Sequence, residues 1–180
     1  MRKIPVISLC LAAACSSSNS PPSPAPAPET RPIAVGGDLR MAGSAIEAVK
    51  TTVPYPGARV FEALTQVYDT LGIALTTLDF KGHLIGNQGM QIRQKLGKVA
   101  LSKYIDCGKS QLVPSADTYE IWLSVVSHVG METPQALEST LTTTVAAKAR
   151  PLEHAQEYFD CKSTGVLEAK IVELVGKMVR

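Results

Sequence analysis

The sequence has few aromatic residues, no net charge beyond its first residues, and no long apolar run. Aromatic side chains make up 5% of the 180 residues, too few for a surface that stacks nucleobases. Of the 18 basic residues, only Arg2 and Lys3 lie in the first 14 positions, which leaves 16 basic against 16 acidic residues in the remainder. A chain with this balance lacks the positive field of proteins that bind nucleic acids or anionic lipids.

The motifs of common enzyme families are also missing. The sequence contains no Gly-x-Ser-x-Gly, no Walker loop and no dinucleotide-binding fingerprint. His83, His128 and His154 are far apart and lack the spacing of metal ligands. We therefore expect solvated or structural histidines, no metal, no cofactor and no catalytic residue.

The first fifteen residues have the layout of a secretory signal. Arg2 and Lys3 form a basic start, residues 4–14 are mostly apolar, and small residues precede Cys15. The apolar run is too short to span a bilayer core, which needs about 20 apolar residues. We expect residues 1–14 to be removed on export.

The stretch Leu11-Ala12-Ala13-Ala14-Cys15 resembles the lipobox of bacterial lipoproteins. In that family the cysteine is diacylglycerated and the signal is cut directly before it, so the resemblance implies lipidation of Cys15. The family usually has leucine three positions before the cysteine, where this chain has Ala12. The alternative is ordinary secretion, with cleavage after Ala14 and Cys15 left as a free thiol.

A lipidated Cys15 would hold the protein on a membrane surface. One acyl chain binds marginally, whereas two or more anchor stably, at about 0.8 kcal/mol per buried CH₂. The resemblance implies two chains such as palmitate, or three if the amine is also acylated. Ser16 is not acidic, which in better-known members of the family favours the periplasmic face of the outer membrane.

Residues 15–33 read as a linker of Pro, Ser and Ala. Such a composition cannot bury enough apolar surface to offset the entropy of ordering. Its prolines favour an extended polyproline conformation that could reach ~50 Å at ~3.1 Å per residue. We interpret it as a spacer between the membrane and a single globular domain over residues 34–180.

Two segments have helical periodicity. Residues 58–71 carry one apolar stripe, and Gly72 stands where a left-handed cap belongs. Residues 163–179 carry a second stripe, with Ser163 or Thr164 as the expected N-cap. The two stripes consist of Val60, Phe61, Leu64, Val67, Tyr68 and Leu71, and of Leu167, Ile171, Leu174, Val175 and Met178.

Two hairpins are expected between these helices. Residues 73–80 and 83–94 form the first, with Gly82 supplying a positive φ in the turn and a bulge at residues 86–89. Residues 117–129 and 137–149 alternate with period two and form the second. Residues 45–53 contain a weak strand signal. Residues 97–108 fit a short helix or irregular connector, and residues 151–160 connect the second hairpin to the last helix.

This order predicts an α+β domain, in which an antiparallel sheet of four to five strands carries two amphipathic helices on one face. The order is similar to that of the helix-grip domains of an outer-membrane barrel-assembly lipoprotein, a likeness of pattern without a shared motif.

Cys107 and Cys161 remain as a pair if Cys15 is acylated. In an oxidising envelope such a pair is usually a disulfide. Closing a loop of about 55 residues could contribute ~4 kcal/mol in the entropic account of disulfides.

Trp122 stands on the otherwise polar side of its expected strand, so it either contacts a partner or, as we prefer, is covered by the N-terminal segment. We expect a non-enzymatic envelope lipoprotein whose sheet and edges bind another protein in assembly or scaffolding. The alternative is a small-ligand binder or periplasmic enzyme with a pocket between sheet and helices.

Overall fold

The computed structural model describes residues 48–130, 133, 136–152 and 157–180. The predictions for the signal peptide, Cys15, the linker and His154 lie outside these residues. Within the described part, no helix is both long and apolar enough to cross a membrane. The helices and strands are β1 (Ala48–Val53), α1 (Gly57–Leu71), β2 (Thr77–Asp79), β3 (Leu84–Arg93), β4 (Lys95–Leu96), β5 (Val99–Ala100), η1 (Leu101–Lys103), β6 (Ile105–Asp106), β7 (Lys109–Ser110), β8 (Val113–Pro114), α2 (Ser115–Thr118), β9 (Glu120–Gly130), β10 (Ser139–Arg150), β11 (Phe159–Ser163) and α3 (Val166–Met178).

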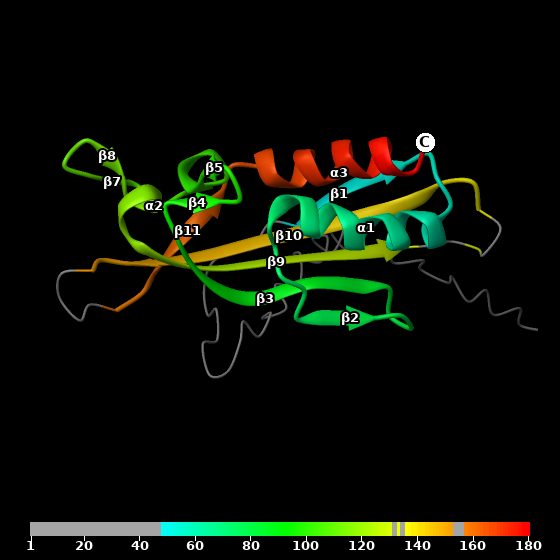
Figure 1. Cartoon of the computed structure of the whole chain (residues 1–180), viewed down its shortest axis with the longest axis horizontal. Coiled ribbons are helices and arrows are strands. Elements are labelled where there is room, and N and C mark those ends of the chain that lie inside the picture. Colours follow the sequence, from blue (N-terminus) through cyan, green and yellow to red (C-terminus); the bar gives the residue numbers. More distant parts are fainter. Residues whose placement is uncertain (1–47, 131–132, 134–135, 153–156) are drawn as a thin grey trace, which may run out of the picture.

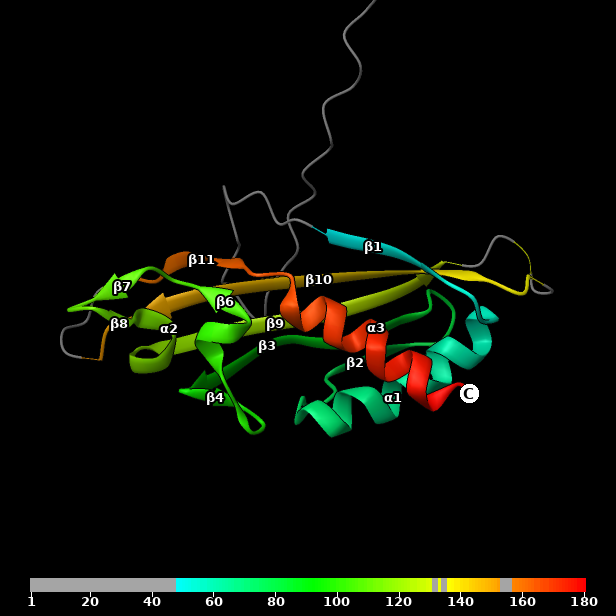
Figure 2. The same cartoon turned by 90° about the horizontal axis from the view of Figure 1, so that it is seen from above.

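Seven antiparallel strands form the main sheet, in the order β2-β3-β9-β10-β11-β6, with β1 also paired to β10. β1 and β11 share one edge of β10: β1 pairs with Ser139 to Thr144, and β11 pairs with Ala147 to Ala149. Helices α1 and α3 lie side by side on one face of the sheet (Figures 1 and 2). The α+β class and the antiparallel sheet are confirmed.

The predicted count of four to five strands was too low. The additional strands are β6 and β11, of two and five residues. β6 is too short to show a period-two pattern. β11 lies across the boundary between the connector predicted over residues 151–160 and the helix predicted from residue 163. The connector predicted over residues 97–108 contains β5, η1 and β6.

Helix α1 forms as its apolar period predicts. The stripe from Val60 to Leu71 is buried, and Val60, Leu64, Val67 and Tyr68 are 0% exposed. Gly72 adopts φ 73° and donates its N–H to the carbonyl of Asp69, which confirms the predicted cap.

The hairpin of β2 and β3 is confirmed, with β2 much shorter than expected. Its turn differs in detail, because the left-handed residue is His83 (φ 47°) and Gly82 is not in that region. The predicted bulge is present as a register shift between Asn87 and Met90.

Helix α3 is confirmed, and its Leu167, Ile171 and Val175 are 0% exposed. Its N-cap residue is Gly165 (φ 78°), in place of the predicted Ser163 or Thr164. The Ser163 hydroxyl instead donates to Glu168 Oε1 at 2.6 Å and accepts the Gly165 N–H at 3.1 Å. The backbone turns so sharply out of β11 that glycine takes the capping position.

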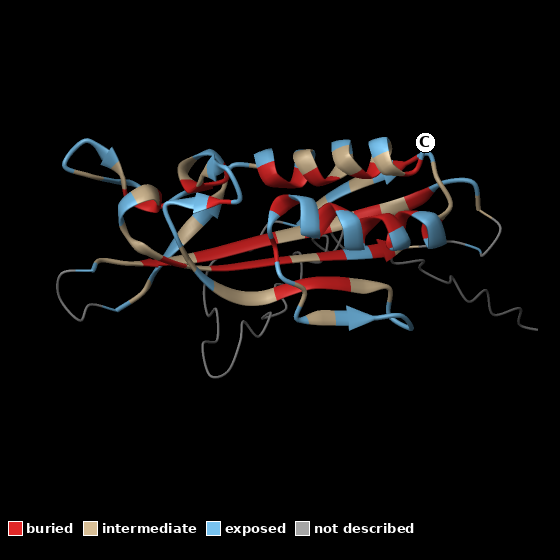
Figure 3. Ribbon diagram, viewed as in Figure 1, coloured by how far each residue is buried: buried red, intermediate tan, exposed pale blue. Residues whose placement is uncertain are grey.

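One cluster of buried hydrophobic residues forms the core, and Figure 3 shows buried residues on both helices and on the central strands. On β9, Ile121, Leu123 and Val125 are 0% exposed, and on β10 Leu141 is 1% exposed. These are the positions predicted to face inward, so the period-two prediction for both strands is confirmed. Full burial of each such side chain contributes about 1.5–3 kcal/mol.

Candidate protein-binding surface

The edge of the sheet at β2 is open and apolar. Among the described strands, β2 pairs only with β3 and lies at the end of the strand order. Leu78 pairs with the buried Ile85, so its side chain points to the helix side of the sheet, yet it is 46% exposed. Phe80 follows at 70% exposed, and its ring meets that of Phe61 in α1 edge-on at 5.7 Å.

The turn beside this edge is held by Asp79. Its Oδ1 accepts the backbone N–H groups of Lys81 (2.9 Å) and Gly82 (3.0 Å). The hydrogen bond from Gly82, followed by that from Lys81, lowers the pKa of the Asp79 carboxyl. The Asp79 carboxylate therefore stabilises the turn, and these hydrogen bonds hold the backbone on both sides of Phe80 in place.

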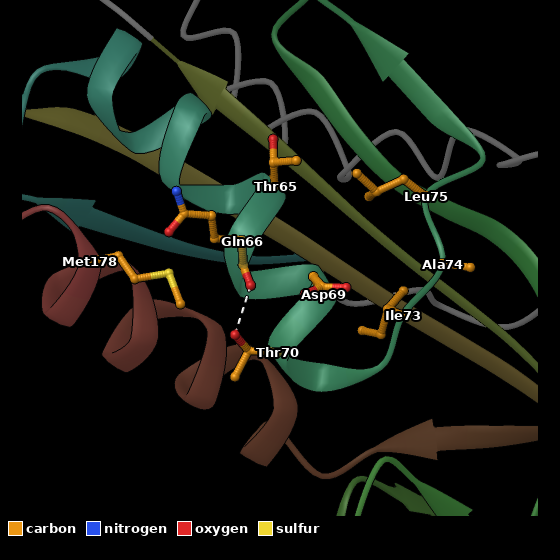
Figure 4. Close-up of a pocket in the computed structure, with 8 residues that line it drawn as sticks. All are labelled: Thr65, Gln66, Asp69, Thr70, Ile73, Ala74, Leu75 and Met178. Carbon is orange, nitrogen blue, oxygen red and sulfur yellow. Dashed lines mark hydrogen bonds between the residues drawn. The ribbon is translucent and has the colours of Figure 1, made fainter.

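A shallow cleft of about 620 Å³ lies over α1, and Leu75, three residues before Leu78, is part of its lining. Its floor is the solvent side of the helix, including Thr65 and Asp69, with Leu75 beyond the helix end and Met178 from α3 on the opposite side (Figure 4). We call Leu75, Leu78 and Phe80, with Thr65 and Asp69, the β2 edge surface. It could pair a strand through backbone groups and cover apolar side chains at the same time.

The opposite edge is less suited to such pairing. β1 exposes Lys50 and Thr52, and a lysine on an edge strand opposes the addition of another strand. The side chains of β1 that share the helix side, such as Val53, are taken up by the core.

Trp122 lies on the face of the sheet opposite the helices, as its parity predicts. It pairs with Gln91 of β3 and Lys148 of β10. Its ring is partly buried, and its Nε1 is enclosed without a hydrogen-bond acceptor among the described residues. A buried donor without an acceptor costs about 1–3 kcal/mol.

A polar network closes one end of this face. Glu120 Oε2 accepts hydrogen bonds from Arg150 and from the Tyr158 hydroxyl (3.2 Å), and Oε1 accepts from Gln91 Nε2 (3.1 Å). The Arg150 guanidinium also lies over the Tyr158 ring at 4.7 Å. The hydrogen bond to Glu120 raises the pKa of Arg150. Nothing in the sequence linked these four residues, because three of them lie on different strands.

The disulfide between Cys107 and Cys161 is present, with a sequence separation of 54 residues. It joins the chain after β6 to β11, next to the pairing of Lys162 with Asp106. Both cysteines are thus structural.

The other predicted positions do not converge. His83 lies 5.8 Å from the Phe61 ring, and His128 is exposed on the outer face. Within the described residues no group of His, Cys, Asp and Glu could hold a metal ion.

A second cleft, of about 630 Å³, lies between α3 and the connector before β6. Apolar walls come from Val99, Tyr104 and Val166. At its rim Glu173 accepts from Lys177 and Lys170, which lowers its pKa to about 2. The cleft is on the outer surface, whereas the predicted ligand pocket was between sheet and helices, where core side chains pack.

No family model and no curated protein matches the chain. The β2 edge surface was missed from sequence, since residues 73–80 show a strand but not its place in the sheet.

Proposed function

We propose that this protein is a non-enzymatic lipoprotein of the bacterial envelope that binds another envelope protein along the β2 edge surface. The observation that carries the proposal is the open edge of β2, with Leu78 46% and Phe80 70% exposed beside it. Exposed apolar side chains next to unpaired backbone groups fit an extended segment of a partner.

The pairing would use two parts of the surface at once. A partner strand would bond to the free side of β2 and so extend the antiparallel sheet. Its side chains on the helix side would cover Leu78 and Phe80 and reach the cleft across α1. Backbone bonds give such complexes affinity, and the pockets beside the strand give them specificity.

The anchor and linker belong to the same proposal. Lipid on Cys15 would confine the domain to a membrane surface, and the linker would let it search within ~50 Å. Confinement raises the effective concentration of a partner in the same membrane, which suits assembly or scaffolding.

The test is affinity capture of the lipidated protein from envelope extract, using two matched leucine variants. Leu78→Glu puts a charge on the β2 edge surface. Leu112→Glu puts the same charge at the tip of the β7–β8 hairpin, where Leu112 is 94% exposed.

We expect the wild type and Leu112→Glu to recover the same protein and Leu78→Glu to lose it. Repeated recovery of lipid alone would refute the binding function. Loss with Leu112→Glu and not with Leu78→Glu would place the binding surface at the other end of the molecule.

A further inference from the structure

The face of the sheet opposite the helices carries apolar side chains without a described element over it. Figure 2 shows α1 and α3 on the other face. On the open face Trp122 and Val126 of β9 stand beside Ala146 of β10, which pairs with Ser124. Ser124 and Ala146 are only 3% and 6% exposed. We call Trp122, Ser124, Val126 and Ala146 the outer patch.

The path of the chain restricts what precedes β1. Ala48 pairs with Thr144, and on the same edge of β10 the next strand begins at the pair of Ala147 with Cys161. Only two residues of β10 separate the two partners, so the chain before Ala48 must leave this edge almost at once. The helix side is taken by α3, which contacts both β1 and β10. The outer face, which holds the outer patch, is the side that is left.

The composition of the chain before β1 changes near residue 33. Residues 16–32 are mainly Ser, Pro and Ala, whereas apolar residues recur between positions 33 and 46. Side chains of this kind gain about 1.5–3 kcal/mol each when fully buried. They are Ile33, Val35, Leu39, Met41 and Ile46.

The segment before β1 is long enough to reach Trp122. Trp122 is two strands away from β1, or ~10 Å, and four residues further along the sheet than Ala48, or ~13 Å. The straight distance is therefore ~16 Å, and the seven residues from Met41 to Ala48 can span ~23 Å when extended. Both Met41 and Leu39 can lie over the Trp122 ring.

We propose that residues 33–47 of this chain dock across the outer face of the sheet and cover Trp122. The linker then leaves from the outer face, and the β2 edge surface stays free. The docking does not depend on the proposed partner.

Fluorescence tests the docking directly, because Trp122 is the only tryptophan in the sequence. The protein is the mature chain with Cys15→Ser, which removes the lipid and keeps every other residue. The variant Leu39→Asp/Met41→Asp places two charges in the docking segment. The control Ala25→Asp/Ala27→Asp places the same two charges in the linker.

We expect the segment variant to shift the emission of Trp122 to longer wavelength and to increase its quenching by acrylamide, while the control leaves both unchanged. Unchanged emission in the segment variant overturns the docking. Emission that shifts with protein concentration in the wild type also overturns it, because a second copy would then be the cover.

Proteolysis supplies the reciprocal measurement. Arg40 is the one site for trypsin between residue 16 and Lys50, since Arg31 precedes Pro32. If the segment docks on Trp122, Trp122→Ser should speed cleavage after Arg40 while the disulfide-linked domain stays intact. Equal rates of cleavage in both proteins would contradict the docking.

Discussion

The hydroxyl of Tyr68 connects α1 to strands β9 and β10 through buried hydrogen bonds. The helical periodicity of apolar residues places Tyr68 in the apolar stripe of α1, where the residue is 0% exposed. The hydroxyl donates to Ser127 Oγ at 3.0 Å, and Ser127 Oγ lies 2.9 Å from Thr143 Oγ1. Ser127 and Thr143 are direct partners across β9 and β10. One chain of hydrogen bonds thus fixes the position of α1 on the sheet.

Tyr68→Phe should lower the free energy of unfolding by about 1 kcal/mol, because it removes one buried hydrogen bond and leaves the ring in place. Urea unfolding followed by circular dichroism measures the change. Tyr119→Phe is the control, since Tyr119 is half-buried at the surface against Phe159, and it should stay within about 0.5 kcal/mol.

The buried hydroxyl of Tyr68 should also make the stability of the protein depend on pH. Burial raises the pKa of Tyr68 well above its ordinary value of 10, so above about pH 10 the unfolded chain loses the proton more readily than the folded one. The wild type should therefore lose more stability than Tyr68→Phe between about pH 9 and about pH 11. A difference between the two proteins that stays constant over this range would contradict it.

At the scale of elements, the backbone of β3 lies very close to that of β9 at Gly86. A Cβ added to Gly86 would lie 2.3 Å from the carbonyl oxygen of Val125 and 2.7 Å from the Cα of Val126. These are backbone atoms of the central strand, which cannot move without disturbing the pairing of the sheet. The register shift between Asn87 and Met90 follows directly along β3.

Gly86→Ala should therefore destabilise the fold by about 3 kcal/mol, the upper end for overpacking in a tight site. Gly176→Ala is the matched control in α3, where an added Cβ meets no atom within 4 Å. There the substitution should stabilise by about 0.5–1 kcal/mol, because alanine is the better helix former. Thermal unfolding of both variants decides the prediction, and equal effects of the same sign would refute it.

For the whole molecule, the disulfide joins the middle of the described chain to the strand before its last helix. Cys107 follows β6, and Cys161 lies in β11 just before α3. The bridge holds the connector and the last helix together across 54 residues of sequence. Disulfides form and persist in oxidising compartments and are rare in the cytosol.

Intact-mass analysis of the mature protein, with and without reductant, tests anchor and bridge in one experiment. We expect a chain beginning at Cys15 with two or three acyl chains, and reduction should add two hydrogen atoms. Reduced protein should be less stable to urea by ~4 kcal/mol. A mature chain without fatty acid would refute the anchor and leave the disulfide result intact.

The sequence by itself determined the class of fold and most of its long elements. The stripe of α1, the cap at Gly72, the alternation of β9 and β10 and the cysteine pair each depend on neighbours in sequence or on parity, so local physics suffices to predict them. The tertiary structure alone decided which strands are edges, that β11 and β6 extend the sheet, that Gly165 caps α3, and that Tyr68, Ser127 and Thr143 meet. Tyr68 lies 59 positions from Ser127, and Ser127 lies 16 positions from Thr143. No local pattern contains the information about which distant backbone or side chain will be adjacent.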